Sequence, residues 1–351
     1  MLSTPRLQDE LLSSWLVRLA MAQGCDPLVL TSFFWPHRRV WTTDLDRGTI
    51  GPPAACAGLS ASDFSELTLE GIASRVAFHN GPNGAVWPWI LAAGCRNRRR
   101  HGGLQFCTEC LAADARPYYR RCWRLAWHTS CLKHSCSLMD SCGLCGAVPE
   151  PHRLTLASPH IALCANCGAD FRTQASPPCN VQAVCFQQRA DEAVERGEAC
   201  YGNATILTKE WFRLARFVVA LLRAAGRKGH QPFSRLFAQL GVEQGRLRVS
   251  VTGLPLELLP IGDRMGLLAL TCQILDVESG LVVDAALSSG LTRGALLFVG
   301  GQVPSCLEPL IAALPQSTSR LPRKASAKRR HPRPRSVIEQ MVARLKRKIR
   351  P

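Results

Sequence analysis

The sequence, 351 residues long, lacks the segments that would place it in or across a membrane. No uncharged apolar run reaches the roughly 18 to 20 residues that a membrane span needs. The N-terminus, MLSTPRLQDELLSSW, has no basic segment followed by an apolar one, so a secretory signal is not expected. We therefore expect a cytoplasmic protein with no membrane segment.

Common catalytic motifs are missing too. The sequence contains no P-loop, no acidic metal-binding cluster and no nucleophile motif. The H-x-E and P-C-x-x-C pattern of zinc-dependent deaminases is also absent. These absences predict a binding protein rather than a nuclease, a recombinase or another enzyme.

Acidic residues are scarce relative to basic ones. There are 26 Asp and Glu against 43 Lys and Arg, which gives a formal net charge of +17. Residues 316–351 alone contain 13 basic residues and one Glu, and the basic segment RNRRRH occupies residues 96–101. An excess of positive charge favours a polyanionic partner, usually nucleic acid. We expect contact with DNA, and the alternative is a solubilising tail without a specific role.

Cysteine, in contrast, is abundant. The chain has 17 cysteines, seven of them between Cys107 and Cys145. Where thiols are kept reduced, regularly spaced cysteines more often bind metal than form disulfides. The odd total points the same way, so the cysteine-rich segment predicts metal binding.

Eight potential ligands form two units of two close pairs each. The first unit is Cys107 and Cys110, then 20 residues, then Cys131 and His134. The second unit is Cys142 and Cys145, then 18 residues, then Cys164 and Cys167. A gap of two residues lets both donors of a pair turn toward one ion, and two pairs complete the tetrahedral set of a closed zinc site. We predict two structural Zn²⁺ ions, in preference to an iron–sulfur cluster or a catalytic zinc.

Neighbouring residues add detail to these units. Cys136 lies two residues past His134 and is the alternative fourth ligand of the first unit, although His134 keeps the spacing of the other pairs. In the second unit Gly143 lies inside one pair, while Gly146 and Gly168 directly follow the two pairs, which predicts tight turns around an ion. His128 is expected to be a packing residue.

The segment RPYYRRCWRLAWH, residues 116–128, mixes arginines with aromatic residues. It can bind nucleic acid through phosphate pairing and base stacking. Alternatively, Trp123, Leu125 and Trp127 form the core of the metal module while the arginines are solvated. The candidate nucleic-acid contacts of the whole chain are Arg96, Arg98, Arg99, Arg100, Arg120, Arg121, Arg323, Lys324, Lys328, Arg329 and Arg330.

Apolar periodicity predicts a mainly α-helical fold with small zinc-ribbon or zinc-finger modules. The expected helices cover residues 7–23, 27–34, 62–66, 181–197, 206–226, 232–242, 260–277 and 291–299. Thr208 is the expected N-cap and Gly226 the expected C′ residue of one of them. The segment WPWIL, residues 87–91, is expected to be a buried anchor.

Composition divides the chain into four expected regions. Residues 1–101 contain a helix-turn-helix pattern, and residues 102–176 form a double zinc-finger module. Residues 177–314 form a helical C-terminal domain, and residues 315–351 form a basic tail that is expected to be disordered.

Several of these stretches carry a resemblance to a known family. LLSSWLVRLA, GLSASDFSELTL (58–69), the segment from FCTEC to CGLCG (106–146) and LELLPIGDRMGLLALTCQIL (256–275) resemble the TniQ/TnsD family. The most specific part is the order F-C-x-x-C, D-A, P-Y-Y-R-R-x-W-R-L, C-x-x-H, C-x-x-C, and the likeness covers roughly residues 8–277. Cys122 departs from the small residue expected at its position, and the basic tail has no counterpart in the motif.

The resemblance implies an N-terminal helix-turn-helix, two zinc fingers with the eight ligands named above, and a helical C-terminal domain. It also implies a non-enzymatic role in selecting the target sites of cut-and-paste transposons. Such a protein links a target-recognition element, for example a CRISPR Cascade complex, to an AAA+ transposition regulator of the TnsC or TniB type, and a homodimer is expected. The alternative is a zinc-finger and helix-turn-helix transcriptional regulator that reads DNA by itself. RNA-guided and direct targeting both stay open.

Overall fold

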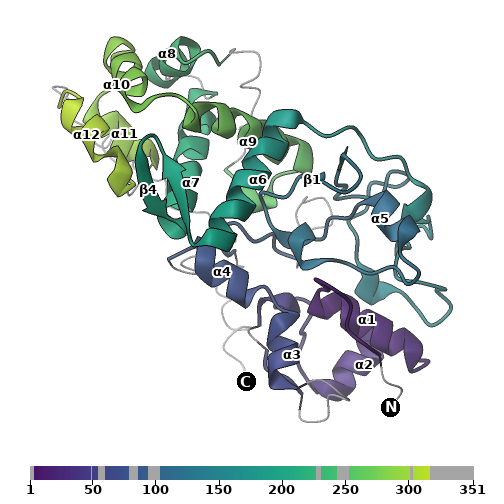
Figure 1. Ribbon diagram of the computed structural model, residues 1–351. Coiled ribbons are helices and arrows are strands. Elements are labelled where there is room, and N and C mark those ends of the chain that lie inside the picture. Colours follow the sequence, from purple (N-terminus) through teal and green to yellow (C-terminus); the bar gives the residue numbers. More distant parts are fainter. Residues whose placement is uncertain are drawn as a thin grey trace, which may run out of the picture.

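The computed structural model describes residues 4–48, 50–53, 60–78, 86–93, 103–226, 231–242, 253–300 and 303–316. Helices are the main regular element of these residues, so the predicted mainly α fold class is confirmed (Figure 1). The basic run at 96–101 and the tail from residue 317 onward lie outside the described residues.

The N-terminal region begins with two helices joined by a short turn. Helix α2 (Pro27–Phe34) forms where the sequence predicts it. Helix α1 (Leu12–Ala22) begins five residues after the predicted start at residue 7, because Glu10 forms a β-bridge with Arg120 instead. Gly24 in the turn between them has a left-handed backbone with a φ of 69°. Helix α1 is buried on most sides because it packs on α2 along one face and on the main core along another. Helices α3 (Ala61–Glu66) and α4 (Glu70–Val76) complete this region.

The cysteine-rich middle of the chain has little regular structure. Its elements are helix α5 (Thr108–Ala113), strands β1 (Ser130–Cys131) and β2 (Cys136–Ser137), and the 3₁₀ turns η2 (Arg121–Arg124), η3 (Pro151–Arg153) and η4 (Phe171–Thr173); the turn η1 (Leu45–Arg47) lies before them. Strands β1 and β2 pair antiparallel, with Cys131 opposite Cys136. With so few backbone hydrogen bonds in regular elements, this segment needs another source of order.

The C-terminal half is a helical layer with one β-hairpin (Figure 1). Its elements are α6 (Val181–Arg196), β3 (Glu198–Tyr201), β4 (Ala204–Leu207), α7 (Thr208–Ala225), α8 (Gln231–Gln239), η6 (Leu256–Leu258), α9 (Ile261–Leu275), α10 (Ser279–Ser288), α11 (Arg293–Gly300), η7 (Ser305–Leu307) and α12 (Glu308–Ala313). Helix α6 packs along α9, and α7 lies beside both.

The predicted ends of helix α7 are wrong in detail. Thr208 is the first helical residue and not the N-cap, because the hairpin that precedes it leads directly into the helix and Leu207 occupies the cap position. The Thr208 hydroxyl donates instead to the carbonyl oxygen of Ala193 on α6. Gly226 keeps a right-handed backbone, with a φ of −72°, so it is not a left-handed C′ residue.

The predicted anchor WPWIL lies at the centre of the main core. The Trp89 side chain is 1% exposed, and its ring lies 5.2 Å from Phe212 on α7 and 6.2 Å from Phe186 on α6. The residues of this single core come from positions between Leu11 and Leu314, so the metal module and the helical half of the chain share one core. Among the described helices none alone is long and apolar enough to cross a membrane; α9 and α10 meet that test only as a pair bent by 106°.

Candidate metal centres

The first predicted unit closes into one compact cluster. The Sγ atoms of Cys107, Cys110 and Cys131 and a ring nitrogen of His134 all lie within 4.8 Å of one another. Cys107 caps the start of α5, Cys131 belongs to β1, and His134 lies in the turn to β2. In that turn Ser135 takes a left-handed backbone, with a φ of 51°, which lets the chain reverse beside the cluster.

The distances in this cluster suit a tetrahedral ion. An ion bonded to thiolates at about 2.3 Å and to imidazole at about 2.0 Å separates two sulfurs by about 3.8 Å and sulfur from nitrogen by about 3.5 Å. The Sγ atoms of Cys110 and Cys131 are 3.6 Å apart. His134 Nδ1 lies 3.4, 3.3 and 3.6 Å from the three sulfurs. The cluster can therefore hold a metal ion.

Cys136 lies beside this cluster and not within it. Its Sγ is 3.7 Å from that of Cys107. The set of mutually close donor atoms nevertheless contains His134 and leaves Cys136 out. Of the two candidates for fourth ligand, His134 is therefore the one that faces all three remaining sulfurs.

The second predicted unit closes in the same way. The Sγ atoms of Cys142 and Cys167 are 3.8 Å apart, and those of Cys145 and Cys164 are 3.6 Å apart. Cys142 and Cys164 are buried, whereas Cys145 and Cys167 are exposed. This cluster can hold a second metal ion, at the surface of the molecule.

Both pairs of the second unit have the same backbone turn. The N–H groups of Gly146 and Gly168 each donate to the carbonyl oxygen of the first cysteine of their pair at 2.8 Å. Their φ values of 69° and 75° are left-handed, which confirms the predicted role of these two glycines. Gly143 does not share that conformation; its N–H donates to Oε1 of Gln174 at 2.8 Å.

The thiols of each cluster differ in their affinity for protons. Hydrogen bonding with Cys107 and Cys110 lowers the pKa of Cys131, while hydrogen bonding with Cys110 raises the pKa of Cys107. In the second cluster, hydrogen bonds lower the pKa of Cys145 to about 6, and the largest contribution comes from the backbone N–H of Ala147. Donors this close cannot all be charged without a cation between them, because like charges repel strongly at such distances.

The segment that carries the first cluster connects to the C-terminal half. Oε1 of Gln187 on α6 accepts hydrogen bonds from the backbone N–H groups of Thr129 and Ser130, at 3.1 and 3.2 Å. Arg264 on α9 is fully buried and donates to the carbonyl oxygen of Ala126 at 2.9 Å. An ion that fixes this segment therefore also fixes the surface on which α6 and α9 pack.

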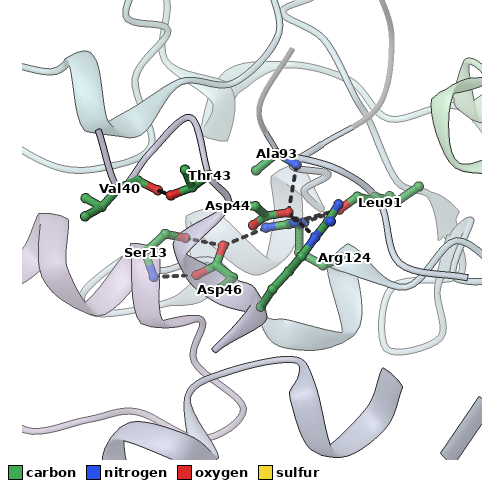
Figure 2. A network of polar contacts seen from close by, with 9 residues as sticks. Ser13, Val40, Thr43, Asp44, Asp46, Leu91, Ala93 and Arg124 are labelled. Carbon is green, nitrogen blue, oxygen red and sulfur yellow. Dashed lines mark hydrogen bonds and ion pairs between the residues drawn. The ribbon is translucent and has the colours of Figure 1, made fainter. Parts of the chain in front are cut away.

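Arg124 connects the same segment to the N-terminal helices (Figure 2). Its side chain is fully buried, and its guanidinium donates to Asp46 at 2.6 Å and to Asp44 at 2.7 Å. Asp46 also accepts the N–H and hydroxyl of Ser13 on α1, at 2.7 and 2.8 Å (Figure 2). The alternative that placed the arginines of residues 116–128 in solvent is thus wrong for Arg124, because its charge neutralises buried carboxylates.

The other predictions for residues 116–128 have mixed outcomes. Trp123, Leu125 and Trp127 are buried, as a core role requires. Nε2 of His128 lies 2.7 Å from Oδ1 of Asp191 on α6. His128 is not part of either cluster, which agrees with its predicted packing role.

The candidate nucleic-acid contacts within the described residues are already engaged in the chain. The Arg120 guanidinium lies 4.3 Å from the ring of Tyr118 and 4.7 Å from that of Trp123. Arg121 pairs with Asp9 at 3.0 Å. The remaining candidates lie outside the described residues: Arg96, Arg98, Arg99, Arg100, Arg323, Lys324, Lys328, Arg329 and Arg330. Nucleic-acid binding by this set remains a prediction.

The first cluster lies within a segment that matches a known family. The family model TniQ matches residues 2–138. The chain contains a TniQ domain. The predicted resemblance to this family is thus confirmed over that segment, and the match associates the chain with transposition. The TniQ domain includes the first cluster and the α1–α2 pair, while the second cluster begins after its end. No curated protein sequence matches the chain.

Sequence reasoning missed the buried network around Arg124. Its two carboxylates lie in TTDLDRG, 78 and 80 residues before the arginine. The one sequence signal was the presence of Asp44 and Asp46 in a stretch otherwise poor in acidic residues. The two acidic residues do not show which basic residue pairs with them, because an ion pair between residues far apart in the sequence has no characteristic spacing.

Proposed function

We propose that this protein is a zinc-stabilised adaptor in transposition target selection, which links a target-recognition element to an AAA+ regulator of the TnsC or TniB type. The observation that carries the proposal is a closed set of four soft donors within the TniQ domain. Around that set, Gln187 and Arg124 attach the same segment to both halves of the chain. A rigid central segment with helices on either side suits a protein that joins two partners.

Zinc is the ion that we propose for both clusters. Thiolates with at most one imidazole are the ligands of structural zinc. In the first cluster the imidazole of His134 argues against an iron–sulfur cluster, and in both clusters the regular spacing of the pairs favours zinc. Four protein donors leave no open position for a substrate, so the ions would shape the protein without taking part in a reaction. The proposed ligands are Cys107, Cys110, Cys131 and His134 for one ion, and Cys142, Cys145, Cys164 and Cys167 for the other.

A DNA-reading helix-turn-helix regulator is the second candidate function. A recognition helix contacts base edges and phosphates through polar and basic side chains near its start. The second helix of the N-terminal pair, α2, reads PLVLTSFF and contains no basic or amide side chain. This composition favours the adaptor over the regulator.

Mixing the purified chain with the AAA+ regulator encoded by the same transposon tests the adaptor function. We expect a complex that elutes together in size-exclusion chromatography. We also expect DNA binding by the chain alone without sequence preference, measured on random and selected duplexes. Strong sequence preference without regulator binding would favour the transcriptional regulator instead.

The remaining partners belong to the same proposal. We propose that the chain acts as a homodimer and receives the target site from a separate element, such as a CRISPR Cascade complex or a protein that reads a DNA site. Its own contacts with DNA are then contacts to phosphates, which carry no sequence information directly. Adding the candidate recognition element to the purified pair should yield a three-component complex.

Deleting residues 316–351 is expected to weaken the salt dependence of DNA binding. The deletion removes a net charge of +12, from 13 basic residues and one Glu. Each phosphate contact contributes a slope of about −0.9 to the plot of log affinity against log salt. Fluorescence anisotropy with a labelled duplex between about 50 and 200 mM KCl measures this slope. A neutral Gly-Ser tail of equal length is the control, and an unchanged slope would remove the tail from the interface.

A further inference from the structure

One face of helix α2 is apolar and exposed. The side chains of Leu28, Val29 and Phe33 are 48%, 60% and 70% exposed. At about 100° per residue these three positions lie within an arc of about 140°. The exposed Ser32 lies within the same arc and donates its hydroxyl to the carbonyl oxygen of Leu28, whereas Leu30 and Phe34 on the opposite side are buried. We call Leu28, Val29 and Phe33 the α2 face.

The α2 face is supported rigidly from behind. The Trp41 indole N–H donates to the Thr31 hydroxyl at 3.0 Å, and the Trp41 ring stacks on His152 with centroids 4.8 Å apart. Asp26, at the start of α2, accepts the backbone N–H of Leu156 at 2.7 Å. Residues 150–158 lie between the two cysteine pairs of the second cluster, so this cluster helps to hold α2. The exposure of the α2 face is therefore a feature of an anchored helix.

Three large apolar side chains on one exposed helical face indicate a surface that another molecule covers. Duplex DNA does not fit the α2 face itself, because Leu28, Val29 and Phe33 can neither hydrogen-bond to base edges nor pair with phosphates. The hydroxyl of the neighbouring Ser32 donates to the carbonyl oxygen of Leu28. A protein surface with apolar side chains at its centre fits better.

The charge beside the α2 face indicates the kind of protein. His37, Arg38 and Arg39 lie three to five residues past the end of α2, after Trp35 and Pro36, and are exposed. Residues 27–43 contain no Asp or Glu. An apolar centre with a one-sided basic rim is complementary to an apolar element with an acidic rim.

We propose that the α2 face, with Arg38 and Arg39 at its rim, is the docking surface for an apolar, acidic-rimmed element of the AAA+ regulator. The inference rests on the proposed adaptor function and names the surface that performs it. Phe33 and Val29 enter the apolar centre of the partner, and the two arginines pair with its carboxylates. Helix α2 of the pair then binds protein and not DNA.

Two variants of the full-length chain test this surface against the purified regulator. Phe33→Asp is expected to weaken binding by about tenfold or more, since it places a charge at the apolar centre. The double variant Arg38→Glu, Arg39→Glu is expected to weaken binding and to reduce its salt dependence. Leu281→Asp on α10 is the matched control, because Leu281 is 56% exposed but lies outside the α2 face. Unchanged zinc content and melting temperature would establish that the variants are folded.

Each other outcome contradicts the inference in a distinct way. Equal regulator binding by wild type and Phe33→Asp would overturn it and leave the adaptor function intact. A wild-type chain that does not bind the regulator would contradict the proposed function and this inference together. If Phe33→Asp instead dissociates a homodimer in sedimentation, the occupant is a second copy of the chain. If it weakens DNA binding, the occupant is DNA, and either result overturns the assignment.

Discussion

Replacing Cys110 with Ser is expected to reduce the zinc content from two ions to one and to lower the melting temperature by about 10 °C or more. Cys110 is 4% exposed, and its Sγ lies 3.6 Å from that of Cys131 and 3.3 Å from His134 Nδ1. A serine hydroxyl is a poor ligand for zinc, so the three remaining donors would hold the ion weakly. Because α6 and α9 pack on this segment, its disorder would spread to the C-terminal half.

Elemental analysis and thermal unfolding of the purified variants measure this effect. Cys145→Ser should also lose one ion, with a smaller change in melting temperature, because Cys145 is exposed and its cluster lies at the surface. Cys200→Ser, an exposed cysteine outside both clusters, is the control and should retain both ions. His134→Ala should lose an ion and Cys136→Ala should keep both. The reverse would make Cys136 the ligand, and full zinc content in Cys110→Ser would refute the first metal centre.

The sequence was sufficient to locate the metal clusters because their information is local. Each pair of donors is separated by two residues, and the geometry of a tight turn then brings both toward one ion. The glycines that follow the two cysteine pairs of the second unit were predictable for the same reason, because each one belongs to the same tight turn as its pair. The long helices α6, α7 and α9 were predictable for a similar reason, since apolar periodicity depends on residues within a few turns.

Features that depend on distant partners were not predictable. Arg124 has the same composition around it as Arg120 and Arg121, yet it alone among the three is fully buried. Its burial is decided by Asp44 and Asp46, which the fold brings from 80 and 78 residues away. The hairpin β3–β4 was missed for another reason: its strands are four residues each and contain no fully buried residue, so they are too short and too exposed for a strand pattern to stand out in the sequence.

Two sources of order act in the middle of the chain. Around the first cluster, metal ligands and a buried ion-pair network act on the same short segment, from Cys107 to His134. The ligands fix its local shape, whereas Arg124 fixes its position against α1. A substitution in the ion-pair network of Arg124 therefore tests how the N-terminal helices, including the α2 face, are attached to the metal module.

Replacing Arg124 with Met is expected to cost about 3 to 5 kcal/mol of stability near neutral pH. The arginine is 0% exposed, and its guanidinium lies 2.6 Å from Asp46 and 2.7 Å from Asp44. Methionine fills a similar volume but leaves the two buried carboxylates close together, with Arg47 as the remaining cation of this ion-pair network. Removing one partner of a buried ion pair is costly because the remaining charge is neither paired nor hydrated.

The cost of this substitution should be smaller at pH 6 than at pH 8. Burial raises the pKa of Asp46 to about 6, and the charge of Arg124 opposes that rise. A carboxyl whose folded pKa is raised contributes most to stability when it is protonated, so its contribution falls as the pH rises from about 4 through 6. Without Arg124 the pKa of Asp46 rises further, and protonation near pH 6 relieves its repulsion with Asp44.

Urea and thermal unfolding at the two pH values measure both effects. Arg196→Met is the control, because Arg196 pairs with Glu192 at the surface, where the two side chains are 68% and 54% exposed. We expect that control to change stability by at most about 0.5 kcal/mol, with little dependence on pH. Adding Asp46→Asn to Arg124→Met should recover part of the loss at pH 8, since one of the two unpaired charges is then removed. If Arg124→Met is no more destabilising than Arg196→Met, the buried network does not attach α1 to the metal module.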